Sequence, residues 1–208
     1  EVEPDLVRRL DAAFDDPDVG IAGPRVVHAD DPGVIWYGGG IFHAAGGFAR
    51  HRALRRPVDA GDDPAGPTDW VTGCALAVRA PLWESLGGLD ESFYIYAEDA
   101  DLCLRARERG VTIRYVPTAV VRHAVSASAG GRWSAFKAYH RTRSRRQLAR
   151  RHGRGPWTGA VGVLHDLALA GFLLLRGAPR AARAVLEAVA EPATAPVRHS
   201  TRELRPTA

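Results

Sequence analysis

Residues 93–123, FYIYAEDADLCLRARERGVTIRYVPTAVVRH, contain the clearest change of pattern in the chain. Apolar residues recur at helical spacing over 98–109, and Gly110 follows where a left-handed residue would close a helix. Two runs rich in β-branched residues come next, at 111–117 and 119–125. A helix followed at once by strands is typical of an α/β domain, and we expect one here.

The segment before this stretch also alternates between helix and strand. Apolar spacing predicts a helix near 6–14, and an apolar run predicts a buried strand at 19–27. A further strand is expected at 70–78, followed by a helix that starts at Pro81. Residues 28–69 are rich in Gly, Pro, Asp and Arg, and we interpret them as a long excursion with hairpin-like pieces rather than as core.

Composition and charge limit the class of protein. With 208 residues, 46% hydrophobic and 25% charged, the chain suits one well-buried domain with an appendage. Nineteen of its 24 acidic residues lie at or before Asp101, and none lies between Arg122 and Arg154. The second half is therefore expected to face phosphates or a membrane surface. Cys74 and Cys103 form no CxxC pair, so we expect no zinc site or disulfide framework and interpret both as buried small side chains.

The last third of the chain has a different character. Residues 132–155 predict a basic helix with interleaved aromatic residues, and 158–175 predict an apolar helix at the short end of what crosses a bilayer. Three interpretations of the apolar helix stay open: a buried packing helix, a helix lying in the membrane interface, and a true span. A third short helix is expected at 181–190, and the Pro- and Arg-rich tail from 191 is expected to be disordered.

Glu98, Asp99 and Asp101 place three carboxylates in four positions at the start of the helix predicted at 98–109. Negative charge is stabilised at a helix N-terminus, so capping explains one or two of them. Three acids exceed what capping needs, and the aromatic run at 93–96 could raise the pKa of a neighbouring carboxyl group. A carboxylate of raised basicity suits general-base catalysis on a hydroxyl group.

Several segments together resemble the inverting glycosyltransferases of family 2, in particular their bacterial rhamnosyltransferase-like group. The similar segments occur in the family's order and cover most of residues 2–152: PDVGIAGPRVV, DWVTGCALAVRAPLWESLGGLDESFYIYAEDADLCLRARERG, IRYVPTAVVRHAVSASAGG and YHRTRSRRQLARRH. The resemblance implies the GT-A fold, a Rossmann-like α/β fold of nucleotide-diphospho-sugar transferases. This chain is similar to the acceptor-side half of that fold, followed by a helical, membrane-associating extension.

The resemblance also implies a division of the chain into domains. Residues 1–131 correspond to the C-terminal part of the GT-A catalytic domain, 132–190 to the basic and apolar helical extension, and 191–208 to a disordered tail. The family's acidic metal-binding motif would fall at or before Glu1. Because the sequence also lacks an initial methionine, we expect the natural N-terminus and the nucleotide-binding part to lie upstream.

The acids and one histidine take their roles from this resemblance. Asp99 matches the family's catalytic base, which takes a proton from the acceptor hydroxyl group. Glu98 and Asp101 would bind the acceptor or orient the base. His123 matches the histidine that completes a site for a divalent metal, Mn²⁺ or Mg²⁺, which stabilises the diphosphate leaving group.

Two further groups match binding segments of the family. The acceptor-binding group is Trp70, Thr72 and Gly73. The diphosphate-binding group is Arg141, Arg143 and Arg145. The family carries an Arg-Asn pair where this chain has RTRS, so Ser144 departs from the pattern.

The implied function is transfer of a sugar with inversion in bacterial cell-surface or cell-wall polysaccharide synthesis. The donor would be a dTDP- or UDP-sugar, and the acceptor a glycan or a polyprenyl-diphosphate-linked sugar. The expected location is cytoplasmic, at the inner face of the cell membrane. Two alternatives stay open: a non-catalytic scaffold, and a nucleic-acid-binding module built on the Arg-rich helix. No nucleic-acid partner is expected, because that helix follows an acid-rich α/β core without a recognition-fold signature.

Overall fold

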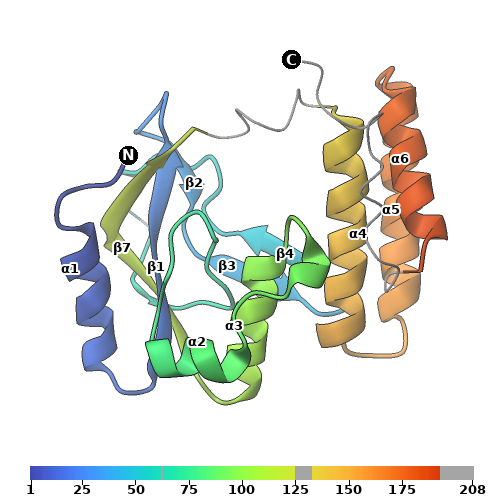
Figure 1. Cartoon of the computed structure of the whole chain (residues 1–208). Coiled ribbons are helices and arrows are strands. Elements are labelled where there is room, and N and C mark those ends of the chain that lie inside the picture. The colour runs from blue at the N-terminus through green and yellow to red at the C-terminus, as the bar shows by residue number, and fades with distance from the viewer. Residues whose placement is uncertain (62, 125–132, 193–208) are drawn as a thin grey trace. The chain divides into compact units, whose positions relative to one another are not determined.

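The computed structural model describes residues 1–61, 63–124 and 133–192, which form two compact units (Figure 1). The first, here called the sheet unit, consists of Glu1–Phe42, Ala49–Asp90 and Glu98–Val125. The second, the helical unit, contains His43–Phe48, Glu91–Ala97 and the described residues from 133 onward. The predicted boundary between 131 and 132 and nearly all of the predicted tail lie outside the described residues.

A five-stranded mixed sheet forms the centre of the sheet unit. β1 (Val19–His28) and β7 (Thr112–His123) run parallel to each other. β2 (Ile35–Tyr37) and β6 (Ala77–Val78) pair antiparallel with β1, and β5 (Gly66–Pro67) pairs antiparallel with β7. Because the two parallel strands end at the same edge, His28 and His123 are register partners.

The helices of the sheet unit are α1 (Leu6–Asp11), continued by a 3-10 turn (Ala12–Asp15), α2 (Ala80–Leu86) and α3 (Glu98–Glu108). Pro81 lies in the first turn of α2, and Gly87 closes that helix with a left-handed φ of 73°. Gly110 follows α3 with a φ of 81°. The predicted α/β architecture, with its helices at these positions, is confirmed.

The core of this unit consists of apolar side chains from the sheet and α3. It includes Val19, Ile21, Val26, Ile113, Tyr115, Leu102 and Ala106. Cys103 is buried among them as predicted, and burial raises the pKa of its thiol to about 12. The same prediction for Cys74 was wrong, because Cys74 is exposed.

The strand expected at 70–78 is mostly absent, since only Ala77–Val78 pairs as β6. The preceding backbone bonds to side chains of α3 instead of to a strand. The N–H of Val71 lies 3.4 Å from the sulfur of Cys103, and the N–H of Gly73 lies 2.7 Å from a carboxylate oxygen of Asp99. The apolar content of residues 70–78 does not reveal that their N–H groups bond to side chains rather than to a neighbouring strand.

The interpretation of 28–69 as an excursion outside the core was also wrong. It supplies β2, whose Ile35 and Tyr37 are almost fully buried, and it supplies β5. The hairpin-like pieces are confirmed, because β3 (Gly40–His43) and β4 (Phe48–His51) form a two-stranded sheet.

The two strands predicted at 111–117 and 119–125 are one strand, β7. Its pairing with β1 jumps from Pro24↔Val116 to Arg25↔Val120, so an irregularity falls at the predicted break. Pro117 has no N–H group to donate a hydrogen bond to the neighbouring strand. In the sequence, its position therefore resembles the end of a strand.

The helical unit contains α4 (Ala135–His152), α5 (Thr158–Leu175) and α6 (Pro179–Ala190), each in contact with the other two. All three helices were predicted. Their apolar contacts include Tyr139, Ala170, Leu173, Ala181, Val185 and Ala188. α4 is basic as expected, but several of its polar side chains are buried, including His140, Arg143, Ser144 and Gln147.

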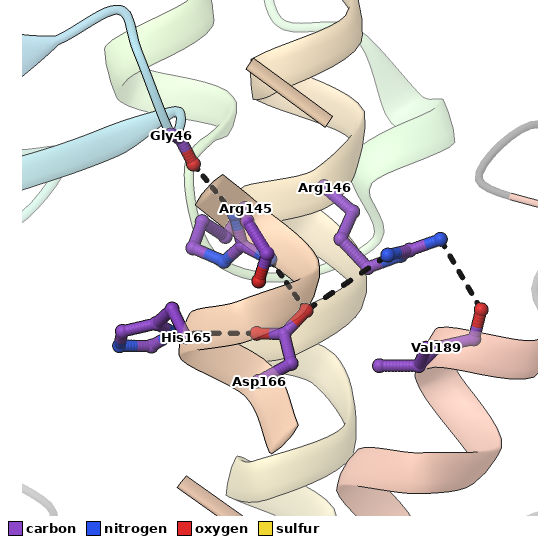
Figure 2. Close-up of polar contacts among 7 residues, drawn as sticks. Gly46, Arg145, Arg146, His165, Asp166 and Val189 are labelled. Atoms are coloured by element: carbon purple, nitrogen blue, oxygen red, sulfur yellow. Dashed lines mark hydrogen bonds and ion pairs between the residues drawn. The ribbon is translucent and has the colours of Figure 1, made fainter. Parts of the chain in front are cut away.

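α5 buries only a stripe of small and polar residues together with Leu173. It is long and apolar enough to cross a membrane, with a mean hydropathy of 1.7, and 22% of it is buried. Asp166, within this apolar helix, pairs with Arg145 of α4 at 2.6 Å (Figure 2). α5 is therefore not a buried core helix within the described residues.

Candidate active site

Asp99 lies in the first turn of α3, and two backbone groups orient its carboxylate. The N–H of Gly73 donates to Oδ2 at 2.7 Å, and the N–H of Ala100 donates to Oδ1 at 2.7 Å. Burial raises the pKa of this carboxyl group, while the two hydrogen bonds and the charge of His51 oppose the rise. The pKa stays above its ordinary value, so the carboxylate is more basic than that of an exposed aspartate.

Glu98 precedes Asp99 and has a different environment. Burial, and to a smaller extent the charge of Asp99, raises the pKa of the Glu98 carboxyl group. Its Oε2 atom is buried and has no hydrogen-bond partner among the described residues. A buried acceptor without a donor is uncommon in proteins.

Asp101 is fully buried and does not share the setting of Asp99. Its Oδ2 accepts from Nε of Arg105 at 2.7 Å. The guanidinium of Arg105 also donates to the carbonyls of Leu86 and Gly88, each at 2.7 Å. Asp101 thus ties α3 to the turn that follows α2.

The predicted acceptor-binding segment runs beside α3. Trp70 and Thr72 are buried, and the Thr72 hydroxyl oxygen accepts from the N–H of Cys74 at 3.3 Å. Gly73 is exposed next to the base. A Cβ atom at Gly73 would be in van der Waals contact with Asp99, 3.4 Å from its Cβ and 3.6 Å from Oδ2, so a side chain here would occupy the space beside the carboxylate.

His51 belongs to this neighbourhood and was missed by sequence reasoning. Its ring lies 4.5 Å from that of Trp36 and 5.3 Å from that of Trp70, measured between ring centroids. Nδ1 lies 2.9 Å from the carbonyl oxygen of Trp36. His51 lies in β4 and Trp36 in β2, so the contact depends on how these two strands pack. No local pattern in the sequence specifies this tertiary contact.

His123, the predicted metal ligand, ends β7 beside His28. Its ring lies 5.0 Å from that of Trp36, and burial lowers the pKa of its imidazole. Over residues 1–61, 63–124 and 133–192, no group of three His, Cys, Asp or Glu side chains could hold a metal ion. The described residues therefore do not fit a metal centre by themselves, and the role of His123 stays a prediction.

The segment before Glu98 has a strained backbone. Tyr94, Tyr96 and Ala97 have φ values of 60°, 67° and 68°, which side chains other than glycine adopt rarely. Such strain persists only where the surroundings hold it, and it concentrates at functional sites.

Part of that support comes from α4. The hydroxyl of Ser144 donates to the carbonyl of Ile95 at 2.8 Å, and Arg141 lies over the ring of Tyr96 at 5.2 Å. Ser144, the departure from the family pattern, therefore holds the strained segment.

The three predicted diphosphate-binding arginines belong to the helical unit and differ in environment. Arg141 is exposed. Arg143 is buried, and its guanidinium lies 3.3 Å from the carbonyl of Ser92. Arg145 pairs with Asp166 (Figure 2). Their predicted role stays a prediction.

Comparison with known proteins identifies the family. Residues 2–149 match the family model described as glycosyltransferase like family 2. This match covers more than half of the chain, so the chain belongs to that family. The predicted resemblance is thereby confirmed.

Several curated bacterial proteins are similar to this chain. The N-acetylglucosaminyl-diphospho-decaprenol L-rhamnosyltransferase of Mycobacterium tuberculosis H37Rv is 34% identical over 122 residues, which is 56% of this chain and 38% of that protein. Rhamnosyltransferase WbbL of Escherichia coli K12 is 41% identical over 49 residues, covering 24% and 19%. The pre-mycofactocin glycosyltransferase of M. tuberculosis H37Rv is 28% identical over 170 residues, covering 79% and 30%. The chain thus spans less than half the length of each.

Proposed function

We propose that this chain is the acceptor-side half of a GT-A glycosyltransferase that transfers a sugar from a nucleotide-sugar to a glycan or lipid-linked acceptor. The observation that carries the proposal is the carboxylate of Asp99. It lies in the matched region of a sugar-transferring family, Gly73 orients it, and its pKa is raised.

In the proposed reaction Asp99 is the general base. As the acceptor hydroxyl gives its proton to the carboxylate, the oxygen forms a bond to the anomeric carbon of the donor sugar. The bond from that carbon to the diphosphate oxygen breaks, and the nucleoside diphosphate leaves with the electron pair. A single displacement of this kind inverts the anomeric configuration. The raised pKa favours it, because proton transfer improves as the pKa of the base approaches the working pH.

The neighbouring residues have supporting roles in this proposal. Glu98 offers its unpaired carboxylate oxygen to an acceptor hydroxyl group. Asp101 acts as a positioning residue through Arg105, since its carboxylate is fully buried. Gly73 leaves room beside the base for the acceptor and supplies the N–H that fixes Oδ2.

Leaving-group stabilisation is assigned by family resemblance to Arg141, Arg143 and Arg145, and to a divalent cation at His123. A metal would supply Lewis-acid stabilisation of the diphosphate. Because the described residues do not complete a metal site, no step above depends on one.

We further propose that the helical unit lies at the inner face of the cytoplasmic membrane. The exposed apolar residues of α5, among them Leu164, Leu167, Phe172 and Leu174, suit the apolar side of an interfacial helix. Arg154 and Arg176 flank this helix and would meet lipid phosphates. A lipid-linked acceptor would be presented at such a surface.

The test is a transfer assay on the full-length protein that carries this chain. Purified protein is supplied with a panel of dTDP- and UDP-sugars, with and without Mn²⁺, and a polyprenyl-diphosphate sugar as acceptor. The expected result is release of nucleoside diphosphate and a product whose anomeric configuration, read by NMR, is opposite to that of the donor. Retention of configuration would contradict the mechanism, and absence of turnover with every donor would favour a scaffold.

A further inference from the structure

A pocket of about 390 Å³ lies within the helical unit, between α4 and the beginning of α5. Its lining has two parts. One part is cationic, and consists of Arg145, Arg146 and Arg150. The other has small side chains or none, and consists of Ala149, Gly153, Gly155, Thr158, Gly159, Gly162 and Val163.

The positive charge of the three lining arginines is only partly neutralised by carboxylates of the described residues. Asp166 accepts from Arg145 at 2.6 Å and lies 3.9 Å from Arg146, and among the residues described it is the carboxylate that pairs with these two arginines (Figure 2). Arg150 is exposed and makes no ion pair within the described residues. One carboxylate against three arginines leaves a net positive charge. The Nε–H groups of Arg145 and Arg146 are also buried without hydrogen-bond partners in the described part of the chain.

The glycines leave part of the lining without side chains. A Cβ atom at Gly159 would meet nothing within 4 Å, whereas one at Gly162 would lie 2.8 Å from a guanidinium nitrogen of Arg145, so that glycine makes room for the arginine. The first turn of α5 has no side-chain cap, so its N–H groups add to the positive potential that the arginines create. Arginine forks together with backbone N–H groups are typical of phosphate recognition.

Outside the pocket, the start of α5 exposes apolar side chains. Trp157, directly before α5, is 72% exposed. Val161 and Leu164, which helical spacing places on another side of α5 from the lining residues, are 38% and 66% exposed. A free phosphate ion would gain nothing from this surface. A phosphate attached to a hydrocarbon chain would use both features, with its head in the pocket and its chain along α5.

We propose that this pocket binds the phosphate or diphosphate group of a lipid. The proposal rests on the membrane association proposed above for the helical unit, and it adds a specific headgroup site to that association. It does not depend on Asp99 acting as a base. The variants used below leave Arg145, which family resemblance also assigns to the diphosphate, unchanged, and alter only Arg150 and Gly159, which have no role in the proposed transfer. Transfer activity therefore tests the proposed chemistry separately from this site.

The experiment measures binding of the 208-residue chain to sedimented vesicles of phosphatidylcholine, with and without phosphatidic acid. Two variants alter the pocket: Arg150→Gln removes its unpaired charge, and Gly159→Leu adds a bulky apolar side chain to its lining without changing the charge. Two matched controls alter α5 and α6 elsewhere: Gly171→Leu, a second α5 glycine with open space around it, and Arg180→Gln, a second exposed arginine. Circular dichroism confirms that each variant folds.

We expect the wild-type chain to prefer vesicles that contain phosphatidic acid. Each pocket variant should lose roughly tenfold in affinity for them, as expected for one charge-assisted hydrogen bond. Gly171→Leu should lose none, and Arg180→Gln should lose clearly less than Arg150→Gln. Equal losses in the two arginine variants, or wild-type binding by Gly159→Leu, would overturn the proposal, because they would indicate a diffuse surface charge. Absence of vesicle binding by the wild type would also overturn it.

A second arm identifies the source of the phosphate. Binding of inorganic pyrophosphate is measured by calorimetry on the same variants. Weak binding that Gly159→Leu abolishes, together with the vesicle result above, supports a lipid phosphate. If pyrophosphate binding depended on the pocket while vesicle binding did not, the ligand would be a soluble phosphate and the lipid assignment would be wrong.

Discussion

Asp99 shows how two opposing effects set the basicity of one carboxylate. Hydrogen bonds from the N–H groups of Gly73 and Ala100 stabilise its ionised form, whereas burial destabilises that form. Burial is the larger effect, and the pKa is raised. The same hydrogen bonds fix the direction of the carboxylate, so this residue combines orientation with basicity.

The raised pKa of Asp99 predicts a stability effect. The folded state holds the proton more tightly than the unfolded state, so the stability that this group contributes is present at low pH and lost as pH rises through the folded pKa. Asp99→Asn removes the ionisation and keeps an acceptor for the N–H of Gly73. We therefore expect a higher melting temperature than wild type at pH 7. The difference should vanish below the ordinary aspartate pKa of 3.8.

Thermal unfolding followed by circular dichroism at both pH values checks this prediction. A difference between variant and wild type that is the same at both pH values would show that the Asp99 carboxylate is not under a burial penalty.

At the residue scale, the sequence predicted the acids but not their environments. Glu98, Asp99 and Asp101 lie within four consecutive positions, and their number exceeded what a helix start requires. Their different burial depends on the rotation of α3 against the sheet, which adjacency does not specify. His51 was missed for a similar reason, since its contacts with Trp36 and Trp70 come from separate strands and loops.

At the scale of elements, α4 is a basic helix with a buried histidine. His140 is 1% exposed, its ring lies 4.4 Å from that of Phe136, and neither ring nitrogen has a hydrogen-bond partner among the described residues. Burial, and then the charge of Arg143, lowers its pKa to about 4. The imidazole is therefore neutral at physiological pH.

This buried histidine predicts a loss of stability in mild acid. Because the folded pKa is depressed, the contribution is complete above the ordinary value of 6.5 and is lost as pH falls through about 4. The size of the effect is roughly 3 kcal/mol. His140→Phe should lose less free energy of unfolding than wild type between pH 7 and pH 4, as measured by urea denaturation. Equal losses in the two proteins would mean that His140 does not titrate as described.

The ion pair between α4 and α5 gives a second prediction for these elements. Asp166 is 1% exposed and its partner Arg145 is 11% exposed. Asp166→Asn leaves Arg145 without its charge partner, and breaking a buried pair costs about 3–5 kcal/mol. The control is Glu187→Gln on α6, which breaks an exposed pair with Arg183 and should cost about 0.5 kcal/mol or less. Similar losses of unfolding free energy in both variants would contradict the packing of α5 on α4 through Asp166.

The helical elements were easier to predict than the strands. α5 begins and ends at the predicted residues, because Gly155 and Pro156 before it and Gly177 after it bound a long, mostly apolar run. The strand expected at 70–78 failed because its N–H groups bond to Asp99 and Cys103 of α3. β2 was hidden in a Gly- and Pro-rich segment, where Ile35 and Tyr37 are the buried large apolar side chains among the residues described.

At the scale of the whole molecule, the chain does not divide once into a sheet part and a helical part. Segments His43–Phe48 and Glu91–Ala97 belong to the helical unit, although both lie within the region predicted to be a single α/β domain. The second segment carries the strained backbone and directly precedes Glu98. Alternation of helix and strand predicts a fold class. It does not predict which unit a short segment joins, because that depends on tertiary contacts such as the hydrogen bond of Ser144 with Ile95.

The central claim is that this family 2 chain supplies the general base of a sugar transfer, and the rate of transfer by Asp99→Asn tests it most directly. The rate is compared in the full-length protein with that of Glu108→Gln, an exposed carboxylate in the last turn of the same helix. We predict a fall of about 10²–10⁴-fold in kcat for Asp99→Asn, with donor affinity unchanged, and wild-type turnover for Glu108→Gln. Transfer by Asp99→Asn at the wild-type rate would contradict the account.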